Sequence, residues 1–250
     1  MTAVLREMAA RFTSPVEQRL FAEYGAIFVT TAVPPPTIIF AESAEVEAFQ
    51  AQLSVSRARL GDYEVPLQSE AMDALIRAAS EMNDREGQIT ARAEDSGGRS
   101  YQDTVNLWNR NVTRGLNHWQ GEGRITPERA EQIRGLAPKD QVAVVLDIEN
   151  NEQVYFGTFF DRSILYSVAA PGASQHLSLL AFDVAQYQDA EVEAVLGRFG
   201  WFRTVPNDLP HFTYLGHSLD RLPDLGLTRT ERSYGDRAYG FWVPDLERLI

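Results

Sequence analysis

The chain has only four histidines, and the surroundings of two of them suggest metal chemistry. His176 follows the turn-forming pair Pro171-Gly172 and precedes Asp183, which lies in an otherwise apolar run. A carboxylate inside an apolar run is costly unless it is paired or bound to a metal ion. Asp183 is therefore either a cap for the segment that follows it or a metal ligand.

The second histidine, His211, follows an acid in the segment Asp208-Leu-Pro-His211. Pro210 forces an extended backbone, and residues 212–214 have the composition of a strand. Two histidines and one carboxylate form a common catalytic zinc set that leaves a fourth position for water. Asp208 could hold that water while His211 holds the metal. Because a lone histidine is more often a structural residue, the residue types alone leave both interpretations open.

Composition excludes several other kinds of protein. With 250 residues, 44% of them hydrophobic, the chain can form a packed core, as one domain with an N-terminal extension or as two domains. A net charge of −12 argues against a nucleic-acid partner, which requires a basic face, and against a polybasic membrane-surface protein. The absence of cysteine excludes disulfides, thiolate zinc sites and cysteine nucleophiles.

No apolar run approaches the roughly 18 residues of a membrane span. The N-terminal residues are polar and helical, so no signal peptide is visible. The expected location is the cytoplasm, or the periplasm or extracellular space if a leader has been removed.

Helices and strands alternate without regular β-α-β order, which favours an α+β fold with a small antiparallel sheet flanked by helices. Apolar residues at helical spacing predict helices over 1–24 (one, or two broken near Ser14-Pro15), 42–53, 69–82, 104–112, 127–136 and 191–199. Runs of β-branched and aromatic residues predict strands over 25–31, 37–40, 142–148, 154–160, 212–214 and 241–243. The segments 142–148 and 154–160 are expected to form a hairpin.

Three segments resemble one known family. Ser174-x-His176-x-x-x-x-Ala181-x-Asp183 resembles the Ser-x-His-x-x-Gly-x-Ala-x-Asp signature of the zinc D-alanyl-D-alanine carboxypeptidases and dipeptidases of the vancomycin-resistance type. The other two segments are Asp208-x-x-His211, which is similar to the family's Glu-x-x-His motif, and Gly98-Arg99-Ser100-Tyr101 with Leu107-Trp108-Asn109-Arg110 after it, which is similar to the family's Arg-Ser-Tyr segment and helix. The segments follow the family's order over roughly residues 97–216.

The resemblance implies a hedgehog/DD-peptidase-like zinc fold in residues 66–250, preceded by an N-terminal extension or small lobe in residues 1–65. It implies that His176, Asp183 and His211 bind Zn²⁺. Asp208 takes the place of the general base. Arg99 contacts the substrate and stabilises charge on the carbonyl oxygen, and Ser174 lines the substrate pocket.

The implied activity is zinc-dependent hydrolysis of peptide bonds to D-amino acids in peptidoglycan stem peptides, with a D-Ala-D-Ala carboxypeptidase favoured over a dipeptidase or an endopeptidase. A free substrate carboxylate would need a further cation, for which Arg110 and Arg203 are candidates. Leu179 stands where the family has glycine, and Asp208 where it has glutamate. Because the shorter acid changes the general base and leaves the zinc ligands intact, the alternative is a non-catalytic zinc-stabilised domain that binds peptidoglycan or protein.

Overall fold

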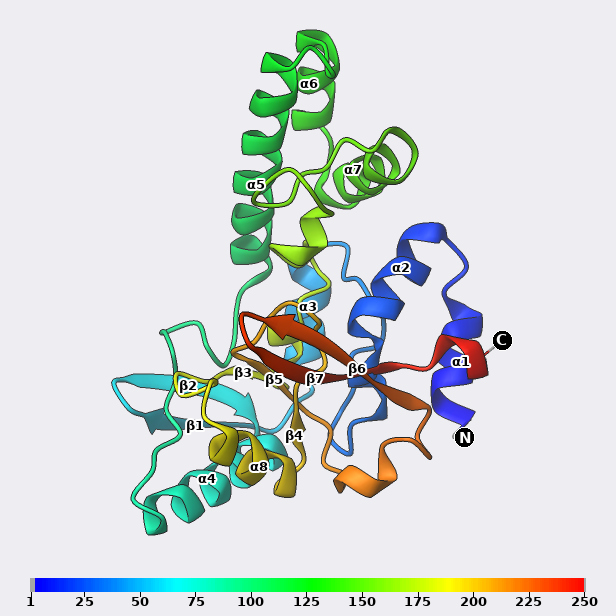
Figure 1. Cartoon of the computed structure of the whole chain (residues 1–250). Helices are drawn as coiled ribbons and strands as arrows, with labels where there is room; N and C mark the ends of the chain where they lie inside the picture. The colour runs from blue at the N-terminus through cyan, green and yellow to red at the C-terminus, as the bar shows by residue number, and fades with distance from the viewer. Residues whose placement is uncertain (1–2, 250) are drawn as a thin grey trace. The chain divides into compact units, whose positions relative to one another are not determined.

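The computed structural model describes residues 3–249, which form two compact units. The first unit comprises Met1–Ile38, Glu47–Arg99 and Gln175–Ile250, and the second comprises Ile39–Val46 and Ser100–Ser174. Figure 1 traces the chain through both. The boundary predicted near residue 65 is not a boundary between these units, but compact units need not be functional domains, so that division stays a prediction.

The first unit mixes helices with short strands. Its helical elements are α1 (Ala3–Arg11), α2 (Pro15–Tyr24), η1 (Gly25–Val29), α4 (Ser69–Asp84), η3 (Gln175–Ser178), α8 (Ala190–Arg198), η4 (Leu219–Arg221) and α9 (Leu246–Leu249), while α3 (Ser43–Gln50) crosses the unit boundary. Its strands are β1 (Val55–Leu60), β2 (Tyr63–Gln68), β3 (Ala181–Asp183), β4 (Trp201–Phe202), β5 (His211–Tyr214), β6 (Leu227–Tyr234) and β7 (Arg237–Pro244).

Three antiparallel sheets organise these strands. The hairpins β1-β2 and β6-β7 are two-stranded, and the third sheet has the order β3-β5-β4 (Figure 1). In the third sheet Ala181, Phe182 and Asp183 pair with Thr213, Phe212 and His211. Phe182 and Phe212 are both fully buried. The apolar centre of this pairing therefore fixes the register at which Asp183 meets His211.

Local signals account for several helices. Ser14 caps α2 in a capping box with Glu17, so the N-terminal helical segment is broken at the predicted place. Thr126 caps the helix Pro127–Arg134 by accepting a hydrogen bond from the backbone N–H of Arg129. Gly200, at φ +81°, lies between the end of α8 at Arg198 and the start of β4 at Trp201.

Two predicted N-terminal strands are wrong. Residues 25–29 form the 3-10 helix η1, all five of them buried, and 37–40 has no regular structure. A short run that is apolar on every side does not distinguish a buried strand from a buried helical turn. Here the run continues directly from the end of α2 at Tyr24 as a further helical turn.

The second unit is helical. It contains α5 (Tyr101–Gly121), α6 (Pro127–Arg134), α7 (Pro138–Glu152) and η2 (Ile164–Tyr166). The buried Trp108 indole N–H donates to Gln141 Oε1 at 2.8 Å, which joins α5 to α7.

The predicted hairpin over 142–160 is also wrong. Residues 142–148 belong to α7, where Val142, Val145 and Ile148 are buried at helical spacing. The following segment is a loop, because the buried carboxylate of Glu149 accepts the backbone N–H groups of Phe156 and Ile164. These N–H groups would otherwise need a partner strand.

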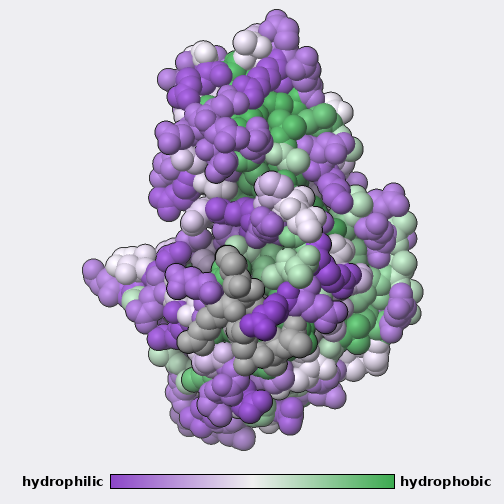
Figure 2. Space-filling view, turned by 90° about the vertical axis from the view of Figure 1, so that its right-hand side faces the viewer, coloured by the Kyte–Doolittle hydropathy of each residue, from purple (hydrophilic) through white to green (hydrophobic). Residues whose placement is uncertain are grey.

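The α+β class with small antiparallel sheets is confirmed. None of the described helices is long and apolar enough to cross a membrane. Hydrophilic residues cover most of the face shown in Figure 2, with smaller apolar patches between them.

Candidate metal centre

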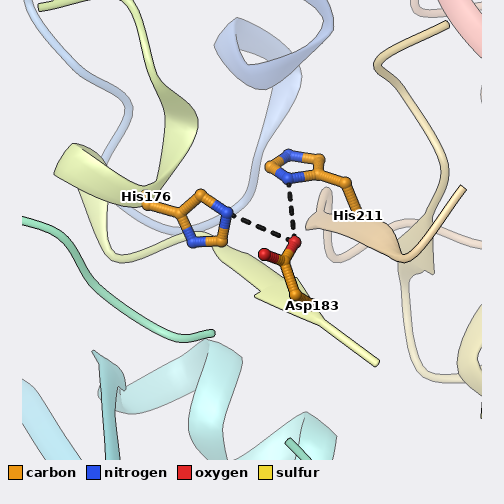
Figure 3. Close-up of side chains that lie close together, drawn as sticks. All are labelled: His176, Asp183 and His211. Carbon is orange, nitrogen blue, oxygen red and sulfur yellow. Dashed lines mark ion pairs between the residues drawn. The ribbon is translucent and has the colours of Figure 1, made fainter. Parts of the chain in front are cut away.

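Three short elements of the first unit bring the predicted ligands together. His176 lies in η3, Asp183 ends β3, and His211 begins β5. Figure 3 shows both imidazoles directed at one carboxylate oxygen of Asp183. Residues separated by up to 35 positions in the sequence (176 to 211) therefore face one point.

The distances within this set suit a zinc ion. Asp183 Oδ1 lies 3.3 Å from His176 Nε2 and 3.3 Å from His211 Nδ1, and the three candidate ligand atoms lie within 4.8 Å of one another. Two ligands at about 2.0–2.1 Å from a tetrahedral zinc ion are about 3.3 Å apart. The group could hold a metal ion.

Unsatisfied polar atoms point the same way. Among the described residues, both ring nitrogens of His176 and Asp183 Oδ1 are buried without a hydrogen-bond partner. Such atoms are rare in folded proteins, because each loses its interaction with water. A bound cation would satisfy Asp183 Oδ1 and one His176 nitrogen together.

The surroundings favour the protonation states that a metal requires. Burial lowers the pKa of His176 to about 4, so its imidazole is neutral at physiological pH. Burial acts to raise the pKa of Asp183, but the adjacent His176 and His211 outweigh it and hold that pKa well below its usual range. A neutral imidazole and an ionised carboxylate are the ligand forms that bind zinc.

Arg99 lies against the opposite oxygen of the same carboxylate. Its Nη2 donates to Asp183 Oδ2 at 3.1 Å, and its Nε donates to Asp95 at 2.8 Å. This contact leaves Oδ1 of Asp183 facing the histidines. A partner of this kind fixes the orientation of a carboxylate ligand.

Asp208 lies on the turn that leads into His211. The backbone N–H of His211 donates to the carbonyl of Asp208 at 3.3 Å, and Asn207 next to it has φ +76°. Desolvation raises the pKa of the Asp208 carboxyl; the charge of His211 opposes this shift and that of Asp183 adds to it. Asp208 thus lies within electrostatic reach of the candidate ligands.

Leu179, one of the two positions at which the sequence departs from the family motifs, has an unusual backbone conformation. Leu179 has φ +54°, a left-handed conformation that glycine adopts without cost. Its side chain is buried, and Gly98 lies so close that an added Cβ would be 2.8 Å from Leu179 Cδ2. Because residue 98 has no side chain, there is room for the Leu179 side chain in this strained conformation.

The remaining predicted site residues have different outcomes. Arg203 is only 2% exposed, and its guanidinium donates to the carbonyls of Leu209 and Tyr187 and pairs with Glu193. It cannot bind a substrate carboxylate, so that suggestion is wrong. Arg110 and Ser174 belong to the second unit, and their predicted substrate contacts stay predictions.

Sequence reasoning missed Gln175 and Arg92. Gln175 Oε1 lies 2.9 Å from His211 Nε2, although the residue falls at an unspecified position of the motif. Next to the bridge between Ala91 and Val184, the backbone N–H of Arg92 donates to the carbonyl of Asp183 at 3.0 Å, so the backbones of these two residues are adjacent. The only local signal for Gln175 was its position between two predicted site residues, Ser174 and His176, and no local signal marked Arg92.

The comparisons with known proteins gave limited overlap. No family model and no curated protein matches the chain. Among solved structures, a mutant of the vancomycin-resistance D,D-pentapeptidase VanY, in complex with Zn(II), has 16% identity and a TM-score of 0.38, covering 66% of this chain and 82% of its own. VanYB in complex with D-alanine-D-alanine also has 16% identity and a TM-score of 0.38, with 66% and 80% covered. The LD-carboxypeptidase LdcB has 18% identity and a TM-score of 0.35, with 60% of each chain covered.

The chain is thus similar to solved proteins of the kind that its motifs resemble.

Proposed function

We propose that the protein is a zinc-dependent peptidase that cleaves bonds to D-amino acids in peptidoglycan stem peptides. The observation that carries the proposal is the convergence of His176 Nε2, Asp183 Oδ1 and His211 Nδ1 at distances that suit tetrahedral zinc. Three protein ligands with an open fourth position are typical of catalytic zinc, whereas structural zinc has four.

Each side chain around the site has a distinct part in the hydrolysis. A bound zinc ion would lower the pKa of water from about 15.7 to about 7 and polarise the peptide carbonyl. Asp208 accepts the proton of the attacking water and passes it to the leaving amine as the C–N bond breaks. Arg99 places fixed positive charge near the developing oxyanion. Its Nη1 has no hydrogen-bond partner among the described residues and is available for that contact.

The substrate class rests on the motif resemblance, and Arg92 supports a peptide with a free carboxylate. The backbone of Arg92 is hydrogen-bonded to that of Asp183, and its charge acts on Asp208. Its guanidinium stacks on Tyr187 at 5.7 Å from the ring centroid, and it has no ion-pair partner among residues 3–249. An exposed, unpaired cation at this position suits the terminal carboxylate of a D,D-carboxypeptidase substrate.

A non-catalytic, zinc-stabilised domain that binds peptidoglycan peptides is the second candidate. Asp208 favours it, because this side chain is one methylene shorter than the family glutamate. A hedgehog/DD-peptidase-like fold would accommodate either function.

Incubation of zinc-loaded protein with a muropeptide ending in D-Ala-D-Ala, followed by mass spectrometry, separates the two candidates. A peptidase releases one D-alanine from this muropeptide. The Asp208→Asn variant should bind the muropeptide but release no D-alanine. Elemental analysis of the same samples should find one zinc per wild-type chain and a loss in His176→Ala. Wild type that binds the muropeptide but leaves it intact would establish the binding domain.

A further inference from the structure

Gln175 connects the N-terminal segment to a candidate metal ligand. Its side chain is buried, its Nε2 donates to the carbonyl oxygen of Tyr24 at 3.0 Å, and its Oε1 lies 2.9 Å from His211 Nε2. The hydroxyl of Thr213 also donates to the same Oε1 at 2.5 Å. One amide thus contacts the C-terminal end of α2 and two residues of strand β5, His211 and Thr213.

The partners of this amide determine which way it faces. A backbone carbonyl can only accept, so the NH₂ group must face Tyr24 and the oxygen must face His211. The ring nitrogen opposite that oxygen must then carry the hydrogen. His211 is therefore held with hydrogen on Nε2 and with the lone pair of Nδ1 directed at the candidate metal position.

The other tautomer has a competing partner. Asp183 Oδ1 lies 3.3 Å from His211 Nδ1, so a hydrogen on Nδ1 would face that carboxylate. In that state the ring could not offer Nδ1 to a metal ion. Gln175 Oε1, the acceptor at Nε2 on the opposite side of the ring, disfavours the tautomer with hydrogen on Nδ1.

We propose that Gln175 is a positioning residue that keeps His211 in its metal-binding tautomer, and that the Tyr24 carbonyl completes this device. The inference rests on the proposed metal site. It also gives the N-terminal residues a role in the centre, since Tyr24 ends α2 (Pro15–Tyr24). Partners that orient a ligating histidine in this way typically change metal affinity 10- to 100-fold when removed.

Nitrogen-15 NMR of the imidazole rings of metal-free protein at pH 8 tests the tautomer directly. The chain has four histidines, so the spectrum contains four ring systems, and His211→Asn assigns the relevant one. Wild type should show His211 with hydrogen on Nε2 alone. Gln175→Leu should shift hydrogen to Nδ1, and zinc affinity measured by chelator competition should fall about 10- to 100-fold.

Two further variants separate positioning from general damage. Gln50→Leu removes another glutamine bond to η3, from Nε2 to the carbonyl of Leu177 at 2.9 Å, without touching a ligand, and should leave tautomer and affinity unchanged. Gln175→Glu keeps the acceptor for His211 but opposes the Tyr24 carbonyl, so it should restore the tautomer and part of the affinity.

A Gln175→Leu protein with the wild-type tautomer and zinc affinity would overturn the inference. Equal losses in Gln175→Leu and Gln50→Leu would do so as well, because they would indicate general damage to η3. If wild type binds no zinc, yet its His211 tautomer depends on Gln175, the proposed function fails while the tautomer assignment holds.

Discussion

Asp183 and His211 are a register pair of β3 and β5, with Oδ1 of the carboxylate 3.3 Å from Nδ1 of the imidazole. Paired residues of adjacent strands present their side chains on the same face. The backbone pairing of Phe182 with Phe212 therefore brings the two candidate ligands together. A shift of register by one residue would turn one of them to the opposite face.

The pH dependence of stability should report on His176. Burial lowers the pKa of this residue to about 4, against about 6.5 in the unfolded chain. Between these values the unfolded imidazole binds a proton that the folded one does not, so stability falls as pH falls. Urea unfolding of chelator-treated protein should give a free energy of unfolding lower by about 1–2 kcal/mol at pH 5 than at pH 7.5 from this residue. His176→Asn does not titrate and should lose correspondingly less; an identical pH profile would contradict the prediction.

Arg99→Ala should impair both chemistry and metal retention. Removal of one donor to a developing oxyanion typically lowers kcat about 100- to 1,000-fold, with less effect on KM. Because Arg99 also donates to Asp183 Oδ2, zinc affinity should fall by roughly 10-fold or more. Steady-state kinetics at saturating zinc and chelator competition separate the two effects. An Arg99→Ala enzyme within a few-fold of wild type in kcat would make this arginine a structural residue only.

Asp208→Asn should lower turnover by roughly 100-fold or more while zinc remains bound, because the amide cannot accept a proton. The turn that holds Asp208 is fixed by Arg203, whose Nε donates to the carbonyl of Leu209 at 2.9 Å. Asp208→Glu tests this geometry: a turn adapted to aspartate should tolerate the longer acid poorly. Full activity in Asp208→Asn would place the base elsewhere.

Arg92→Ala should raise KM for a peptide with a free C-terminal carboxylate by roughly 10- to 100-fold, the equivalent of about 1.5–3 kcal/mol for a hydrogen bond to a charged group. The C-terminally amidated peptide should be affected little by the same substitution. Arg77→Ala is the matched control, since Arg77 also stacks on a ring, that of Phe199 at 5.5 Å. Equal effects of Arg92→Ala on both peptides would exclude a carboxylate contact.

Gly98 and Leu179 should be energetically coupled. A Cβ at residue 98 would lie 2.8 Å from Leu179 Cδ2 and 3.0 Å from Pro66 Cγ, so Gly98→Ala should destabilise the protein. In a Leu179→Gly background the first clash is absent, and Gly98→Ala should cost about 0.5–3 kcal/mol less. Urea unfolding of the two single variants and the double variant measures this difference. Additive effects would show that the two residues are independent.

Local patterns in the sequence were sufficient for the elements whose signals lie within one turn or one motif. Ser14 and Thr126 begin helices because their hydroxyls cap the N–H groups three residues later. The three candidate ligands were predicted because a carboxylate in an apolar run requires a partner, and because the family resemblance ordered the motifs. Which residues could hold a metal was therefore a question of residue type and spacing.

The tertiary structure decided what depends on distant partners. Val142 to Ile148 carries β-branched residues, yet it is helical, because the tertiary fold buries its apolar side chains at helical spacing. The next segment is a loop whose N–H groups donate to Glu149. Arg203 was suggested as a substrate cation, but its carbonyl partners and Glu193 bury it. Gln175 had no motif to mark it, because its role requires Tyr24 and His211, which are 151 and 36 residues away. The sequence alone determined the chemistry of the candidate ligands, whereas long-range packing determined their orientation. A hydrogen-bond partner that far along the chain leaves no periodic or local signal.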